Sequence, residues 1–209
     1  MKPPLMSPEL HKQFAKIAGK FSPSLQNALL DIGPLNIPDR RKGGVAQFLS
    51  RAVVGQQLSA RASTCIWLRI EAAVRENQNQ IPNFFCEDNF RSIQKCGVSR
   101  NKIKTLIHIR NAHEKNQLSD AFFKRLDTEA RSAHLTKIWG VGPWTAEMTS
   151  LFYFQDLNIW PEGDIAVQKT FKKFIGESGE VTAKEGAGLF SPYRSFLALY
   201  MWRIVDGEL

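Results

Sequence analysis

Apolar residues recur at steps of three and four along most of this chain, and strict alternation of apolar and polar residues is scarce. The first spacing places apolar side chains on one face of a helix, whereas alternation is typical of a strand. Two helix starts are marked by an N-cap serine followed by proline, at Ser7-Pro8 and Ser22-Pro23. Another helix is expected over about 45–54, and capping residues precede three more at Ser59, Ser99 and Asp127. The sequence therefore predicts an all-α fold.

Composition narrows the class of protein. The 209 residues are 43% hydrophobic and 23% charged, as in ordinary globular chains, and 28 Lys and Arg against 20 Asp and Glu give a formal net charge of +8. This positive excess favours a polyanionic partner such as nucleic acid. Three cysteines (Cys65, Cys86 and Cys96) are too few for a disulfide framework and lack the spacing of a zinc or iron–sulfur site.

The sequence shows no apolar segment of the length that a signal peptide or a membrane span requires. We therefore expect a protein that is not secreted and has no membrane as a partner. Its expected location is cytoplasmic, at the nucleoid, if the source is bacterial, and nuclear if the source is eukaryotic.

The segment 91–115 is strongly basic, with a single acidic residue, Glu114. A charge run of this kind is either a solvated helix face or a rim that faces phosphates. Its seven basic residues are Arg91, Lys95, Arg100, Lys102, Lys104, Arg110 and Lys115.

The stretch 135–146 reads Leu-Thr-Lys-Ile-Trp-Gly-Val-Gly-Pro-Trp-Thr-Ala, which predicts a helix, a Gly-x-Gly turn and a second helix that begins at Pro143. Gly140 and Gly142 allow positive φ and have no Cβ, so the amides around Val141 and Gly142 can point outward together. Amides of this kind at a helix N-terminus bind phosphate without reading base sequence. The alternative is a plain turn between two helices.

The segment 160–171 presents a carboxylate after a Pro-Glu-Gly turn. Asp164 stands at the start of an expected helix whose inner residues are Ile165, Val167 and Phe171. An aspartate in this position is either a plain N-cap or, in combination with the preceding hairpin, a reacting group.

The hairpin, the Gly- and Pro-rich loop and the downstream aspartate together resemble the helix–hairpin–helix DNA glycosylases, in that family's order and spacing. The sequence GQQLSARA at 55–62 resembles the family's DNA-probing turn, and 192–202 resembles the closing helix of its 3-methyladenine glycosylase II branch. The resemblance covers roughly 22–205 and implies an all-α, two-lobed fold that holds DNA and a damaged base between its lobes. We expect one glycosylase unit over 1–209, with one lobe at about 40–150 and the other formed by 1–39 and 151–209.

Departures from the family pattern refine this expectation. Trp144 stands where strand-cleaving members carry a Schiff-base lysine, so the resemblance implies a monofunctional enzyme without lyase activity. The last cysteine is Cys96, so the C-terminal iron–sulfur cluster of some relatives is not expected. The helical core begins almost immediately, as in a compact form without the N-terminal β-rich domain. Trp139 replaces a proline before the Gly-x-Gly, and Met148 stands where the branch can carry a pocket aromatic.

The resemblance also implies roles for individual residues. Asp164 would stabilise the oxocarbenium-like sugar and orient the attacking water, with Glu162 as the second candidate. Gln57 would fill the gap left by a flipped base, with Gln56 or Leu58 next in line. The base pocket would be formed by Trp144, Met148 and Trp202.

The hairpin would contact DNA through Gly140, Val141, Gly142, Trp144 and Thr145. By the same resemblance, the main-chain carbonyls of Thr136, Ile138 and Val141 would hold a monovalent cation, Na⁺ or K⁺. No cofactor is expected to be required, and no zinc is expected.

The implied function is base-excision repair. A monomer would bind damaged duplex DNA, flip out an alkylated purine such as 3-methyladenine or 7-methylguanine, and hydrolyse its glycosidic bond to leave an abasic site. Aromatic faces attract such positively charged bases. Two alternatives stay open: a non-catalytic protein that binds DNA structures, and the same fold acting on uracil, mismatched thymine or an oxidised purine.

Overall fold

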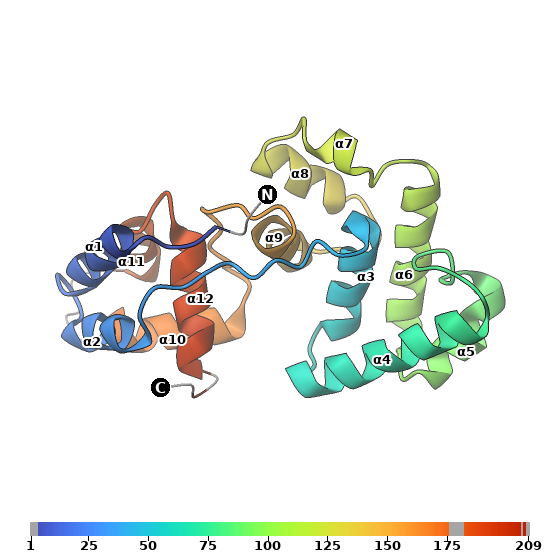
Figure 1. Cartoon of the computed structure of the whole chain (residues 1–209), viewed down its shortest axis with the longest axis horizontal. Coiled ribbons are helices and arrows are strands. Elements are labelled where there is room, and N and C mark those ends of the chain that lie inside the picture. Colours follow the sequence, from blue (N-terminus) through green and yellow to red (C-terminus); the bar gives the residue numbers. More distant parts are fainter. Residues whose placement is uncertain (1–3, 176–181, 206, 208–209) are drawn as a thin grey trace. The chain divides into compact units, whose positions relative to one another are not determined.

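The computed structural model describes residues 4–175, 182–205 and 207, and within these ranges it contains helices and no strand. The prediction of an all-α fold is confirmed. The chain divides into two compact units (Figure 1), the first formed by Met1–Asp39 together with Phe154–Leu209 and the second by Arg40–Tyr153.

The first unit contains, in its described residues, the helices α1 (Pro8–Ala18), α2 (Pro23–Ile32), α10 (Ile165–Ile175), α11 (Ala183–Gly188) and α12 (Arg194–Val205). Helix α12 packs against α2, α10 and α11, and α1 packs against α2. Aromatic rings fill the space between these helices. Phe14 meets Phe190 edge to face with ring centroids 4.9 Å apart, and Trp160 meets Phe171 at 5.1 Å.

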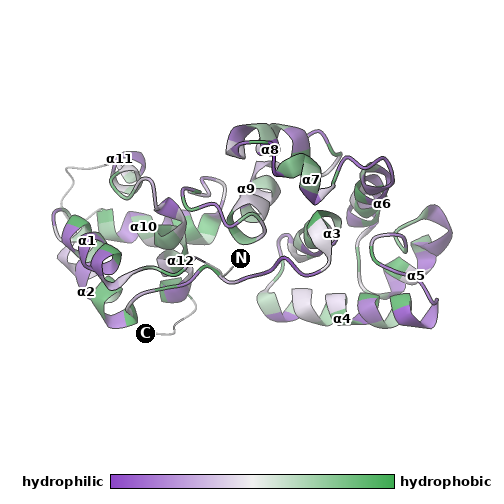
Figure 2. Cartoon of the chain, turned by 45° about the horizontal axis from the view of Figure 1, so that its top comes forward, coloured by the Kyte–Doolittle hydropathy of each residue, from purple (hydrophilic) through white to green (hydrophobic). Residues whose placement is uncertain are grey.

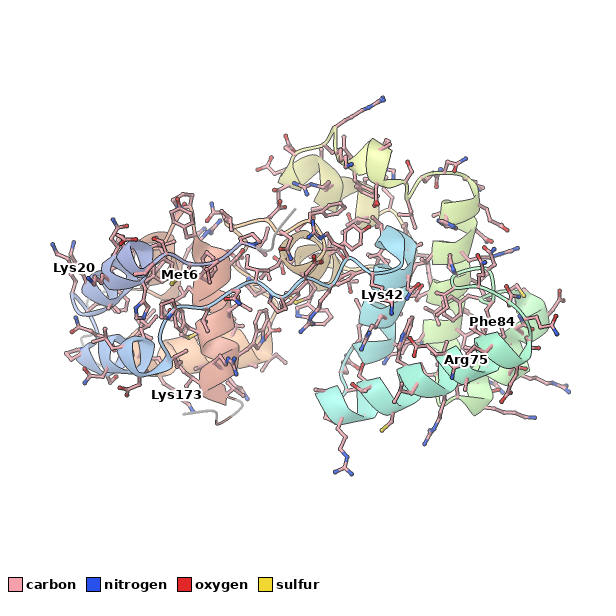
Figure 3. All side chains as sticks on the ribbon, in the orientation of Figure 1. Met6, Lys20, Lys42, Arg75, Phe84 and Lys173 are labelled. Carbon is pink, nitrogen blue, oxygen red and sulfur yellow. The ribbon has the colours of Figure 1, made fainter. Side chains whose placement is uncertain are left out.

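Tyr200 ties α12 to the N-terminal segment of the same unit. Its hydroxyl donates to the carbonyl of Gly33 at 2.8 Å and lies 3.3 Å from the sulfur of Met6, which is labelled in Figure 3. Burial raises the pKa of the Tyr200 hydroxyl, so it remains a neutral donor at physiological pH. The two ends of the sequence therefore share one core.

The second unit contains, in chain order, α3 (Gly44–Gly55), α4 (Ala60–Glu76), the short 3₁₀ helix η1 (Glu87–Asn89), α5 (Phe90–Lys95), α6 (Arg100–Glu114), α7 (Asp120–Phe123), α8 (Thr128–Leu135) and α9 (Pro143–Phe152). Helix α3 is its centre, because it packs against α4, α6 and α9. Its apolar residues Val45, Leu49 and Val53 are fully buried. Hydrophobic and hydrophilic residues both appear along the helices in Figure 2, as expected where each helix buries one side.

The predicted helix starts are confirmed. Each of Ser7, Ser22, Ser59, Ser99 and Asp127 accepts a hydrogen bond from the backbone amide three residues further along. The prediction that Ile165 faces inward is wrong. Ile165 is 71% exposed, because α10 turns Val167 and Phe171 inward and leaves its first residue outside.

Candidate functional site

The hairpin joins α8 to α9 through a turn in which the amide of Val141 donates to the carbonyl of Ile138 at 3.0 Å. Gly140 has φ +80°, and a Cβ built on it would overlap the side chain of Thr105 on α6. Both facts demand glycine at this position. The Val141 amide differs from the expectation that it points outward, because it closes the turn, and the Val141 side chain is buried.

The N-terminus of α9 keeps the character of an anion site. Gly142 is the N-cap residue and has no side chain to accept from the first amides, and Pro143 follows at the first helical position. A Cβ added at Gly142 would meet nothing within 4 Å, so the space in front of this cap is open. Amides and the helix dipole together favour a phosphate here.

The candidate DNA-probing turn follows α3. The amide of Leu58 donates to the carbonyl of Gly55 at 3.2 Å. Gln56 has φ −51° and ψ 131°, and Gln57 has φ +56°, which together approximate a type II turn with a non-glycine residue in its left-handed position. Gln57 and Leu58 are exposed, whereas Gln56 is half-buried.

Two residues from other helices hold this turn. The side-chain amide of Gln56 donates to the hydroxyl of Thr145 at 2.9 Å. The amine of Lys102 donates to the carbonyls of Val54 and Gln56, each at 2.8 Å. Burial lowers the pKa of Lys102. Because it bonds to these two carbonyls, the Lys102 amine faces the end of α3 and does not join a rim of phosphate-binding residues. The side chain of Thr145, expected to contact DNA, is 1% exposed and contacts Gln56.

Asp164 lies at the start of α10 in the first unit. It is 9% exposed, and its Oδ1 accepts the amide of Val167 at 3.0 Å. Its own amide donates to the carbonyl of Pro161, which also accepts the side-chain amide of Gln168 at 3.1 Å. The carboxylate is thus a helix cap held in a fixed turn, while the second candidate, Glu162, is exposed.

The loop that leads to Asp164 is fastened by the first residues of α12. Ser195 Oγ donates to the carbonyl of Asp156 at 2.6 Å and accepts the amide of Ile159 at 2.9 Å. Arg194 donates through Nε and Nη2 to the side chain and carbonyl of Asn158, at 2.8 and 3.1 Å. The role of Ser195 could not be predicted from the sequence, because nothing in the residues around a buried helical serine indicates which distant group it will bond.

The expected pocket residues lie in both units. Trp144 and Met148 are four residues apart on α9 and share one face of that helix. Trp144 is half-buried and Met148 is buried. Trp202, half-buried on α12, belongs to the first unit, as does Asp164.

The expected cation ligands all belong to the hairpin turn. Carbonyl oxygens are suitable ligands for a hard cation. The carbonyl of Ile138 accepts a hydrogen bond from the amide of Val141, which engages one of its two lone pairs. The carbonyls of Thr136 and Val141 are the other two expected ligands. The turn therefore fits a monovalent ion in donor chemistry, and the site stays a prediction. Within the described ranges, no cluster of three or more His, Cys, Asp or Glu residues is placed to hold a metal.

Comparison with known proteins shows extended sequence similarity, although no family model matches the chain. The alkylbase DNA glycosidase-like protein mag2 of Schizosaccharomyces pombe is 26% identical over 198 residues, which cover 92% of this chain and 91% of that protein. DNA-3-methyladenine glycosylase 1 of the same organism is 26% identical over 160 residues, which cover 74% of this chain and 70% of that protein.

The fold is also similar to that of solved DNA glycosylase structures. A DNA-3-methyladenine glycosidase from Bacillus halodurans superposes with a TM-score of 0.73 at 26% identity, covering 97% of this chain and 92% of that one. The 3-methyladenine DNA glycosylase of S. pombe, solved with abasic DNA, gives 0.74 at 23% identity, covering 91% and 97%.

The fold is that of the helical DNA glycosylases. The chain is related in sequence to the DNA-3-methyladenine glycosylases, and the resemblance to the helix–hairpin–helix superfamily is confirmed. Across the described residues, no helix is both long and apolar enough to span a membrane.

Proposed function

We propose that this protein is a DNA glycosylase of base-excision repair that hydrolytically removes alkylated purines, 3-methyladenine and 7-methylguanine, from duplex DNA. One observation carries the proposal: the predicted aspartate is a buried carboxylate whose Oδ1 accepts a hydrogen bond from the amide of Val167. Its turn is closed by hydrogen bonds from the Asp164 amide and the Gln168 side chain to the carbonyl of Pro161. The relatives named for 3-methyladenine glycosylase activity support the choice of substrate.

Asp164 is the proposed catalytic residue. As the base leaves, positive charge develops on the sugar, and a preorganised carboxylate stabilises that charge without having to reorganise. The amide of Val167 occupies Oδ1 and fixes the direction of the carboxyl group. Arg194 and Ser195, at the start of α12, donate hydrogen bonds to the loop that precedes Asp164 and keep the backbone of that loop in place. Attack by water at the sugar completes the hydrolysis and leaves an abasic site.

Access to the base requires that it leave the helical stack, at a cost of a few kcal/mol that is lowest for damaged bases. Gln57 is the proposed wedge, because it is exposed in the left-handed position of its turn. Leu58 is 41% exposed beside it, and Gln56 is engaged with Thr145. Gln57 is therefore favoured over Gln56, and Leu58 is the next candidate.

Recognition of the flipped base would rest on its positive charge. Trp144 and Trp202 provide electron-rich faces, and stacking of a cation on such a face contributes about 0.5–2 kcal/mol. Met148, one turn from Trp144, provides a polarisable side chain that adapts to ligand shape. Stacking contacts of this kind select for charge more than for exact shape.

The hairpin is the proposed anchor on the DNA backbone, through the amides at the start of α9 and with a monovalent cation at the carbonyls of Thr136, Ile138 and Val141. Trp144 in place of a Schiff-base lysine supports hydrolysis without strand cleavage. The protein would act as a monomer on damaged duplex DNA. Affinity should fall with salt, with a slope in log–log form of about 0.9 per phosphate contacted.

The test is base release from methylated duplex DNA, with strand breaks scored before and after alkali. Free 3-methyladenine or 7-methylguanine, with breaks only after alkali, is the expected result. Release of neither base would overturn the proposed substrate, and breaks without alkali would overturn the monofunctional mechanism.

One observation favours a second function. The hydrogen bond from Val167 gives Asp164 a structural role as a helix cap, which a non-catalytic DNA-binding protein would also need. In that case the wild type would bind branched or abasic DNA and release no base from any duplex, including duplexes with uracil, mismatched thymine or an oxidised purine. Release from one of those duplexes alone would instead assign the same fold a different base.

A further inference from the structure

The turn at 55–58 is held from two sides by residues far away in the sequence. Lys102, in the first turn of α6, donates to the carbonyls of Val54 and Gln56, both at 2.8 Å. Thr145, in the first turn of α9, accepts from the side chain of Gln56 at 2.9 Å. Three hydrogen bonds therefore join the end of α3 to the beginnings of two other helices.

We propose that Lys102 and Thr145 are positioning residues that hold this turn so that Gln57 stays presented for insertion into DNA. The inference rests on the proposed function in one respect, that the turn probes DNA. It gives Lys102 a role different from that of a phosphate contact in the basic segment.

The contacts of Lys102 match what the end of a helix lacks. The last carbonyls of an α-helix have no partner within the helix, and a cation near them also complements the helix dipole. Hydrogen bonds from a charged donor are stronger than those from a neutral one. The half-buried amine has two carbonyl partners, and without it the carbonyls of Val54 and Gln56 would each lose a hydrogen-bond donor.

The backbone of Gln57 gives these anchors a purpose. Its φ of +56° is a conformation that non-glycine residues adopt only when their surroundings impose it. The residue before it is fixed at its carbonyl by Lys102 and at its side chain by Thr145. The two anchors thus constrain the turn directly before the strained residue.

Thr145 adds a connection to the hairpin. It is the third residue of α9, directly after Pro143 and Trp144, and its side chain is buried. The turn and the proposed phosphate anchor are therefore parts of one hydrogen-bonded assembly within the second unit. When the start of α9 binds a DNA phosphate, the hydrogen bond between Thr145 and Gln56 would keep the turn at 55–58 in a fixed position relative to that phosphate.

The experiment compares Lys102→Met, which keeps the length of the side chain but removes its donors, with Lys102→Arg and Thr145→Val. Lys104→Met is the matched control, because Lys104 lies on the same helix, is exposed and carries the same charge. Two rates are measured at single turnover, on a lesion in duplex DNA and on the same lesion in single-stranded DNA. Only the duplex requires a base to be displaced from the stack.

We expect Lys102→Met and Thr145→Val to lower the ratio of duplex to single-strand rate by about tenfold, which corresponds to losing one or two hydrogen bonds. Lys102→Arg should restore part of the ratio, and Lys104→Met should leave it at the wild-type value. An unchanged ratio in Lys102→Met, or an equal fall in Lys104→Met, would overturn the proposal.

Hydrogen exchange provides a readout that needs no catalysis. The amide of Leu58 closes the turn on Gly55, so its exchange should accelerate in Lys102→Met while the amides of α6 stay protected. If the wild type releases no base, the proposed function fails, and this exchange result still decides the positioning role. Equal protection of Leu58 in wild type and Lys102→Met would refute it.

Discussion

Replacing Asp164 with Asn and, separately, with Ala divides the two roles that one carboxylate would fill. Ala removes the oxygen that accepts the amide of Val167 at 3.0 Å, and loss of an N-cap costs about 1 kcal/mol. Asn keeps an oxygen in the same place and loses only the charge at the helix start, which contributes roughly 0.3–1 kcal/mol. In a protein of this size, 1 kcal/mol shifts Tm by about 2–4 °C.

The two substitutions should affect catalysis equally. Both remove the negative charge that is proposed to stabilise the developing cation, and loss of one preorganised group of this kind lowers the rate by about 100- to 1000-fold. Both variants should therefore be almost inactive. The Asn variant should be nearly as stable as the wild type, whereas the Ala variant should be less stable. Neither substitution touches the hairpin, so binding to undamaged DNA should stay at the wild-type level.

The assay combines urea unfolding of each variant with single-turnover release of 3-methyladenine from duplex DNA. Glu162→Gln is the control, since this exposed carboxylate lies two residues away and should retain activity. Release of base by Asp164→Asn at the wild-type rate would contradict a catalytic role for Asp164. A loss of activity only in proportion to the loss of stability in both variants would contradict it too, because the carboxylate would then be a cap alone.

Three further predictions concern the turns and a helix cap. Gly140→Ala should destabilise the protein by more than about 1–2 kcal/mol in urea unfolding, since the added Cβ overlaps Thr105 and the positive φ is strained for alanine. Gly142 has φ −89° and open space around it, so Gly142→Ala should fold normally but bind DNA more weakly by fluorescence anisotropy. Equal stability of the two variants would contradict this prediction. Gln57→Gly should raise stability by up to about 1 kcal/mol because φ +56° suits glycine, yet slow excision from duplex DNA; a loss of stability would show that the backbone is not strained. Hydrogen bonds from Thr182 lower the pKa of Glu185, so the capping box should stabilise α11 above the ordinary pKa of a glutamate and weaken as pH falls through the lowered value. NMR exchange of the Thr182 amide should show this pH dependence in the wild type and not in Glu185→Gln, and the same acid response in both would argue against the carboxylate as its cause.

Helix starts were readable from the sequence because a cap is a local interaction. Ser59, Ser99 and Asp127 each bond to an amide three residues away, so residue type and spacing suffice to predict the contact. The position of Asp164 at the start of α10 follows from the same local rule. Gly140 was also readable, since a turn with positive φ requires glycine whatever surrounds it.

Contacts between distant segments were not readable. Lys102 looked like one charge in a basic run, and its partners lie 46 and 48 positions away in the sequence. Thr145 was expected to face DNA, and instead it accepts a hydrogen bond from Gln56, 89 positions away. A side chain of either type is compatible with water, phosphate or a carbonyl, so its sequence neighbours do not determine which of these it meets.

The helical class, the helix starts, the hairpin and the place of Asp164 at the start of a helix could be predicted from the sequence, because period, capping and glycine conformation act over a few residues. Only packing between helices determines which side chains bond to distant parts of the chain: the amine of Lys102 to the end of α3, Thr145 to Gln56 in the turn at 55–58, and Ser195 and Arg194 to the loop before Asp164. These hydrogen bonds form only once packing has brought separate helices together, and no local pattern records them.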